Sequence, residues 1–84
     1  MVGFETQEVE RKVLSILTFL SDSQEPLGAR VISRCLKDHG VELGERAVRY
    51  HLKLMDERGL TRAISRDGRL ITEAGIDELR SALV

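Results

Sequence analysis

The 84-residue sequence predicts an α+β fold that is mostly helical. Two amphipathic stretches are joined by a short turn with glycine at either end, the layout of a helix-turn-helix motif. Two alternating segments follow directly around Asp67-Gly68, a dipeptide typical of β-hairpin turns. One amphipathic stretch precedes this unit and another follows it. The order predicts a winged helix-turn-helix with a three-helix core, a two-stranded wing and a C-terminal helix.

The first helix is predicted to run from Thr6, acting as its N-cap, to about Leu20. Its apolar residues recur at helical spacing, at Val9, Val13, Ile16, Leu17 and Leu20. We expect residues 1–4 to be a loose start. We also expect residues 21–26 to form a loop, because Pro26 ends any helical continuation before it.

The helix-turn-helix motif begins after one or two extended residues at Leu27. Its first helix is predicted from Ala29 to about His39, and Gly40 is expected to end it in the left-handed conformation. The residues expected to face inward are Val31, Ile32, Cys35 and Leu36. The second helix of the motif is predicted over residues 44–58, with Gly44 as a weaker N-cap than serine or aspartate would be.

The wing is predicted over residues 60–72. A two-residue turn at Asp67-Gly68 would place Ile64 opposite Ile71, with both side chains in the core. The same register puts Arg66 opposite Arg69 at the tip, where like charges repel unless an anion lies nearby. Thr72 is then expected to cap a last helix, whose apolar side carries Ile76, Leu79, Ala82 and Leu83.

Composition restricts the class of protein. The chain is short enough for a single domain, residues 1–84, and we expect it to be the N-terminal part of a larger regulator. The single cysteine excludes an internal disulfide and fits a reducing compartment. No apolar run is long enough to span a membrane, and no signal-peptide pattern begins the chain. A cytoplasmic protein is expected.

Positive charge is concentrated in one part of the chain. Residues 44–69 hold seven basic and four acidic residues, a net charge of +3, whereas the whole chain carries −1. At helical spacing, one face of the predicted helix over residues 44–58 is apolar. The opposite face carries three cations, an aromatic residue and no acid: Arg46, Arg49, Tyr50 and Lys53. Such a helix suits a DNA major groove, although a solvated basic face on an ordinary surface helix has the same pattern.

Other chemistry finds little support in the sequence. Cys35 and His39 are four residues apart, a spacing that two metal ligands can use, but only His51 could supply a third. We therefore predict a core cysteine and no metal site, and we expect His51 to be packed or to touch a phosphate. No nucleophile–base pair, glycine-rich phosphate loop or carboxylate cluster occurs. The sequence predicts no enzyme, no catalytic residue and no cofactor in this domain.

The segment LGARVISRCLKDHGVELGERAVRYHLKLMDERGLTRAISRDGRLITEAG resembles the winged-helix domain at the amino end of the NrpR-type nitrogen-regulation repressors of archaea and some bacteria. A related domain begins ribonuclease R. The resemblance covers about residues 9–84, and its most specific pieces are GAR at 28–30, ERAVRYHLKLMDERGLT at 45–61 and GRLITEAG at 68–75. Gly44 departs from the serine or threonine expected before ERAVRYHL, which would loosen the start of that helix.

This resemblance implies sequence-specific binding of double-stranded DNA by a repressor of nitrogen-assimilation genes. It also implies downstream domains that form a homodimer and sense 2-oxoglutarate. An alternative from another class is a winged helix that serves as a protein-interaction or RNA-binding appendage, as the ribonuclease relationship allows.

The resemblance also implies roles for individual residues. Helix 44–58 would enter the major groove, with Arg46 and Arg49 as bidentate guanine readers. Tyr50 would pack on a thymine methyl group or bond a phosphate, and Lys53 would contact a phosphate. The remaining contacts would come from the wing, on flanking DNA, and from the start of the preceding helix: Arg66, Arg69 and Arg30.

Overall fold

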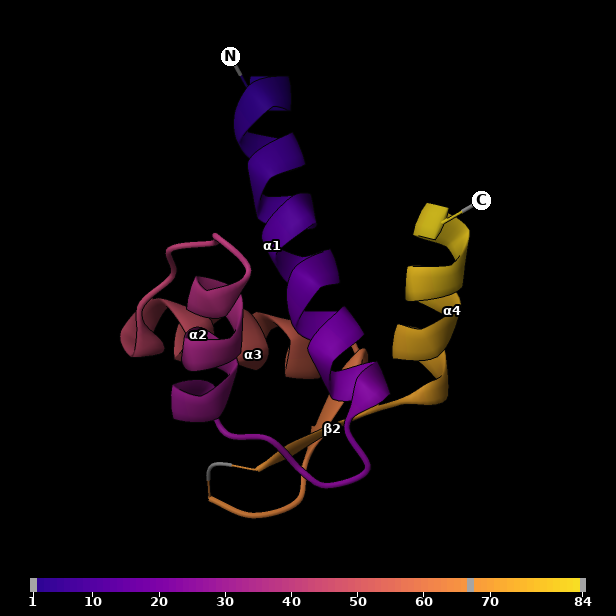
Figure 1. The fold of residues 1–84 in the computed structure, drawn as a ribbon. Coiled ribbons are helices and arrows are strands. Elements are labelled where there is room, and N and C mark those ends of the chain that lie inside the picture. The colour runs from indigo at the N-terminus through magenta and orange to yellow at the C-terminus, as the bar shows by residue number, and fades with distance from the viewer. Residues whose placement is uncertain (1, 67, 84) are drawn as a thin grey trace.

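The computed structural model describes residues 2–66 and 68–83, with the side chains of residues 10–66 and 68–82. The elements follow one another as α1 (Val2–Asp22), α2 (Ala29–Asp38), α3 (Glu45–Glu57), β1 (Thr61–Ala63), β2 (Arg69–Ile71) and α4 (Glu73–Leu83). In Figure 1, α1 stands between α2 and α4, and the hairpin lies below its C-terminal end. This arrangement confirms the predicted winged helix-turn-helix.

The hydrophobic core lies between α1, α2 and α3. Its fully buried side chains come from all three helices: Ile16, Leu17, Ile32, Leu36, Val48, Leu52 and Met55. In α2 and α3 these residues recur at three- and four-residue spacing, and in α1 the buried Val13 and Leu20 extend the pair Ile16 and Leu17 in the same way. Each helix therefore turns one apolar stripe toward the others. The core thereby fixes the rotation of α3 about its own axis, which decides which of its residues face solvent.

The turn between α2 and α3 is closed as its sequence predicts. Gly40 has a positive φ of 82°, and the Val41 N–H donates to the Leu36 carbonyl at 2.8 Å. The Ser33 hydroxyl donates to the Leu43 carbonyl at 2.6 Å, which joins α2 to the far end of the turn. Gly44 is the N-cap of α3 and provides no side-chain cap.

Two helical predictions were wrong in detail. Helix α1 begins at Val2 and continues to Asp22, so Thr6 lies inside the helix and residues 2–4 are not loose. Pro26 excludes helical backbone only at the residue just before it, which leaves Ser21 and Asp22 free to extend α1. In α2, Val31 is 43% exposed and Cys35 only half-buried, because the buried stripe is narrower than predicted and centres on Ile32 and Leu36.

The predicted register of the wing was also wrong. Thr61 pairs with Ile71 and Ala63 with Arg69, a shift of three residues from the predicted pairing. An odd shift exchanges the two faces of a strand, so Ile64 is 46% exposed instead of lying in the core. The expected Arg66–Arg69 pair across the ladder is therefore absent. The predicted turn involves Asp67, which lies outside the described residues.

Contacts outside the hairpin explain this register. Leu27 forms a β-bridge with Arg69, in which each backbone N–H donates to the other's carbonyl at 2.9–3.0 Å. Gly68 packs so closely against Pro26 that a Cβ atom at this position would lie 2.9 Å from the proline Cβ. The loop before α2 thus acts as a third strand, and it holds β2 in a place that the turn residues alone would not select.

The start of α4 depends on Thr72 and Gly75. The Thr72 hydroxyl accepts the Gly75 N–H at 3.1 Å and donates to the Gly59 carbonyl at 2.6 Å, which confirms the predicted cap. A Cβ atom on Gly75 would overlap the carbonyl oxygen of Leu60. Glycine therefore lets α4 lie against the backbone that leads into β1. Within residues 2–66 and 68–83, no helix is long and apolar enough to cross a membrane.

Candidate nucleic-acid interface

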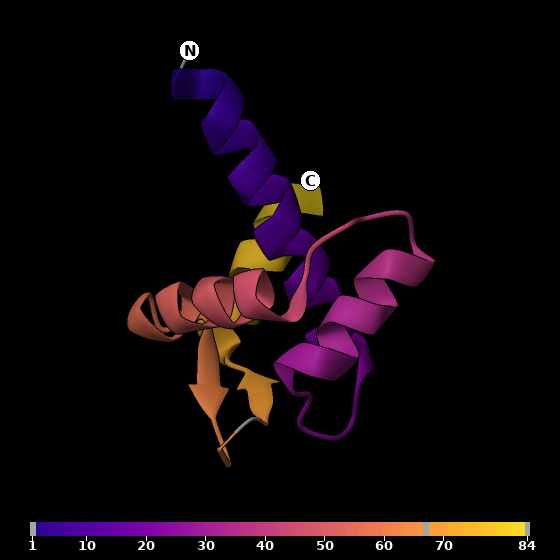
Figure 2. The same ribbon diagram turned by 90° about the vertical axis from the view of Figure 1, so that its left-hand side faces the viewer.

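One face of the molecule is bordered by α3, α2 and the hairpin. Figure 2 shows α3 lying across this face, with the hairpin below it and α2 to one side. All four residues that the sequence predicted for the outer side of α3 are exposed: Arg46, Arg49, Tyr50 and Lys53. Among the large hydrophobic side chains that the structure describes, Tyr50 has the largest exposed fraction, 62%. Burial of the opposite stripe is what turns these residues outward.

Arg49 is partly held by a neighbour on the same helix. Its guanidinium forms an ion pair with Glu45, one turn earlier, and both side chains remain substantially exposed. Such exposed pairs contribute little to stability, so the bond can be exchanged for one to a ligand. Glu45 also lies in the first turn of α3, where a negative charge is favourable.

A hollow of about 250 Å³ separates α3 from the wing. Four basic side chains line it, two from α3 and two from the wing: Arg49, Lys53, Arg66 and Arg69. Ala29, the first residue of α2, and Leu52 line the rest. The fold therefore brings together four of the seven predicted site residues around a cavity that suits an anionic group.

Arg69 differs from the other three cations in forming an ion pair that is partly shielded from water. Its Nε donates to both carboxylate oxygens of Asp56, at 3.0 and 3.3 Å, and its side chain is 17% exposed. The Thr61 hydroxyl donates to the same carboxylate at 2.5 Å. Sequence spacing gave no sign of this cluster, because the approach of Arg69 to Asp56 depends on the register of the wing.

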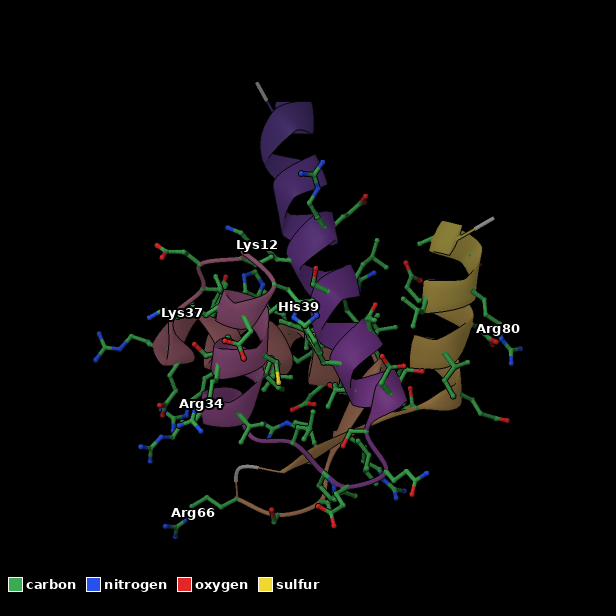
Figure 3. The ribbon with its side chains drawn as sticks, in the orientation of Figure 1. Lys12, Arg34, Lys37, His39, Arg66 and Arg80 are labelled. Carbon is green, nitrogen blue, oxygen red and sulfur yellow. The ribbon has the colours of Figure 1, made fainter. Side chains whose placement is uncertain are left out.

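Further cations on α2 extend the basic surface. Arg30, which the sequence predicted, is exposed, and so are Arg34 and Lys37 at helical spacing from it. Figure 3 shows Arg34, Lys37 and Arg66 directed toward the same side of the molecule, whereas Arg80 on α4 lies at the opposite side. Arg34 and Lys37 were not among the predicted contacts. They lie four and seven residues after Arg30, so helical spacing alone could have placed them on the same face as Arg30.

The possible metal ligands are placed apart from this face. The His39 ring lies edge-on to Phe19 at 4.9 Å, and its Nδ1 is 3.0 Å from the Cys35 carbonyl oxygen. His51 is buried on the side of α3 that faces the core. Among the described residues, no group of three or more histidine, cysteine or acidic side chains could hold a metal ion.

Burial makes His51 a source of acid sensitivity. It is 9% exposed, and burial lowers its pKa below the usual 6.5, with the charge of Lys12 lowering it further. The folded state therefore keeps His51 neutral where the unfolded chain already binds a proton. We expect the free energy of unfolding to fall as the pH drops below about 6.5 toward the pKa of the folded state. Urea unfolding of the wild type and His51→Gln at several pH values tests this. Equal pH slopes for the two proteins would contradict it.

Comparison with known proteins supplies the family. The sequence model described as the ribonuclease R winged-helix domain matches residues 14–79, from the middle of α1 into α4. Global nitrogen regulator NrpR of Methanocaldococcus jannaschii is 49% identical over 75 residues, which cover 89% of this chain and 14% of that protein. Global nitrogen regulator NrpR of Methanococcus maripaludis is 52% identical over 69 residues, which cover 82% of this chain and 13% of that protein.

A third relative, global nitrogen regulator NrpRI of Methanosarcina mazei, is 44% identical over 77 residues, which cover 92% of this chain and 24% of that protein. The chain thus spans less than a quarter of the length of each of these relatives. The predicted resemblance to the NrpR-type repressors is confirmed. The match to the family includes the whole helix-turn-helix and the wing, so the chain belongs to the ribonuclease R winged-helix domain family.

Proposed function

We propose that this domain binds double-stranded DNA sequence-specifically, as the DNA-reading part of a regulator of nitrogen genes. The main support for the proposal is that two features lie on one face of the molecule. These are the outer side of α3 and the hollow beside the wing that is lined by cations. A helix of this kind fits a major groove, and a hollow lined by cations fits a phosphate at the edge of that groove.

In this proposal, α3 lies in the major groove. Arg46 and Arg49 contact guanine edges, and Arg49 exchanges its bond with Glu45 for one to a base. Tyr50 packs on a thymine methyl group or bonds a phosphate. These three side chains are exposed on one side of a rigid helix, so they can reach the groove without rearrangement of the backbone.

The DNA backbone would be held on both sides of the groove. A phosphate enters the hollow between α3 and the wing, where Lys53 and Arg66 approach it. On the other side, Arg30, Arg34 and Lys37 of α2 contact a neighbouring stretch of backbone. Arg69 contributes less directly, because Asp56 already binds its Nε.

The names of the relatives support the regulatory part of the proposal. Each is named a global nitrogen regulator, which favours a DNA-binding module over an enzyme. We propose that this domain forms the N-terminal part of such a regulator, that the complete protein is a homodimer, and that other domains bind the effector, 2-oxoglutarate. A dimer would bind two half-sites, so a single domain should bind DNA only moderately.

The decisive experiment is the salt dependence of binding to a labelled DNA duplex selected from a randomised pool. We expect the logarithm of the binding constant to fall with the logarithm of salt concentration with a slope of about −2.7 to −4.5, for about three to five phosphate contacts. An RNA duplex of the same sequence is the control. Binding to neither duplex at low salt, even by a tethered dimer, would favour the protein-interaction alternative, and preference for RNA would favour the RNA-binding one.

A further inference from the structure

The last turn of α3 is fastened to the wing through one carboxylate. Asp56 accepts the Thr61 hydroxyl from β1 and the Arg69 Nε from β2, so it bonds to both strands of the hairpin. Thr61 is 4% exposed, and the side chains of Asp56 and Arg69 are 28% and 17% exposed. Partial shielding from water makes these charge-assisted bonds stronger than those of an ordinary surface pair.

The hairpin is short, and its angle to α3 depends on contacts outside its own two strands. Each strand is three residues long, and an isolated two-stranded hairpin is at best marginally stable in water. Arg69 supplies two of these contacts, because its backbone bridges to Leu27 while its side chain binds Asp56. One residue of β2 is thus tied to both the loop before α2 and the end of α3.

We propose that Asp56 is a positioning residue for DNA recognition. By binding Thr61 and Arg69, it fixes the angle between the wing and α3, so that Arg66 and Lys53 line the same hollow. A wing without this bond would pivot, and ordering it at each binding event would weaken the complex. The inference rests on the proposed function and adds to it the residue that sets the orientation of the wing.

A competing interpretation makes the opposite prediction. If Arg69 itself binds the DNA, Asp56 competes with the phosphate for its guanidinium. Removing Asp56 would then free Arg69 and strengthen binding. Charge alone leads to the same expectation, because removing a negative charge near the DNA phosphates raises the affinity of the domain for DNA. Only a positioning role predicts weaker binding when this acid is removed.

The neighbouring residue provides a matched control. Glu57 follows Asp56 on α3 and is exposed. Among the described residues, the side-chain bonds of Asp56 are to Thr61 and Arg69, and Glu57 takes no part in them. Asp56→Ala and Glu57→Ala each remove one negative charge and place the same residue in the same turn. We expect Glu57→Ala to bind DNA at least as tightly as the wild type.

For Asp56→Ala we expect binding about two- to tenfold weaker than that of the wild type, the effect of ordering one side chain. The salt slope should become shallower by about one unit, because the phosphate contact of Arg66 is lost. Hydrogen exchange at the Ile64 amide, which bonds to the Gly68 carbonyl, should become faster. Thr61→Val, which removes one bond to Asp56 without changing any charge, should shift binding in the same direction by a smaller amount.

Circular dichroism first establishes that each variant is folded at the temperature of the assay. If Asp56→Ala is unfolded, Thr61→Val alone decides the question. Binding by the decisive variant that equals or exceeds that of the wild type would overturn the positioning role, while DNA binding itself would stand. If the wild type binds no DNA, the proposed function fails, and the positioning role fails with it.

Discussion

Replacing Arg46 and Arg49 with alanine is expected to remove most of the preference of this domain for one DNA sequence over another. The two arginines are three residues apart on α3, and both are exposed on the side opposite the buried stripe. A bidentate contact to guanine discriminates against the wrong base by about 1–3 kcal/mol, so the loss of both should cost about 2–6 kcal/mol of discrimination. Affinity for unrelated DNA should fall much less.

The ratio of two binding constants is the informative measurement. Arg49→Ala also leaves Glu45 without its ion pair close to the DNA, which weakens binding to every sequence. Competition between the selected duplex and a scrambled one cancels that common effect. A double variant, Arg58→Ala and Arg80→Ala, is the control, because it removes the same charge while Arg58 lines a hollow between α1 and α4 and Arg80 projects from α4.

The control should bind all sequences slightly more weakly and keep the wild-type ratio. If the Arg46 and Arg49 variant also keeps that ratio, α3 does not read bases. The basic face would then serve only for nonspecific contact, and specificity would have to come from DNA shape or from other residues.

The helices could be predicted from the sequence because their signals are local. Val48, Leu52 and Met55 recur at helical spacing, and Gly40 marks the end of α2, so neither prediction needs information from distant residues. Even here the ends were predicted less accurately, since α1 extends beyond both of its predicted boundaries. The exposed side of α3 followed from the same periodicity that identified its buried side.

The wing could not be predicted to the same accuracy because distant contacts set its register. The Leu27–Arg69 bridge joins segments that are far apart in the sequence, and it outweighs the preference of the turn dipeptide. The same bridge places Arg69 beside Asp56, so the error in register hid the ion pair as well. For this site, cations on one helix were predictable, whereas their organisation between elements was not.

Leu52→Ala is expected to destabilise the domain by about 2–5 kcal/mol, as for other fully buried leucines. The Leu52 side chain is 1% exposed and lies in the core that α3 shares with α1 and α2. A domain of this length has a total stability of about 4–13 kcal/mol, so this one substitution removes a large share of it. Unfolding in urea, followed by circular dichroism, gives the change directly if the slope against urea concentration stays constant.

Leu54→Ala is the matched control, since it makes the same chemical change two residues away on the same helix. Leu54 is 36% exposed, and we expect its truncation to cost about 1 kcal/mol or less. Positions 52 and 54 lie about 200° apart around a helix, so the two variants together measure the rotation of α3 without any DNA. If Leu54→Ala proved the more damaging, α3 would be turned the other way. Arg46, Arg49 and Lys53 would then face the core side, and both the proposed groove contact and the hollow beside the wing would fail for a reason independent of binding.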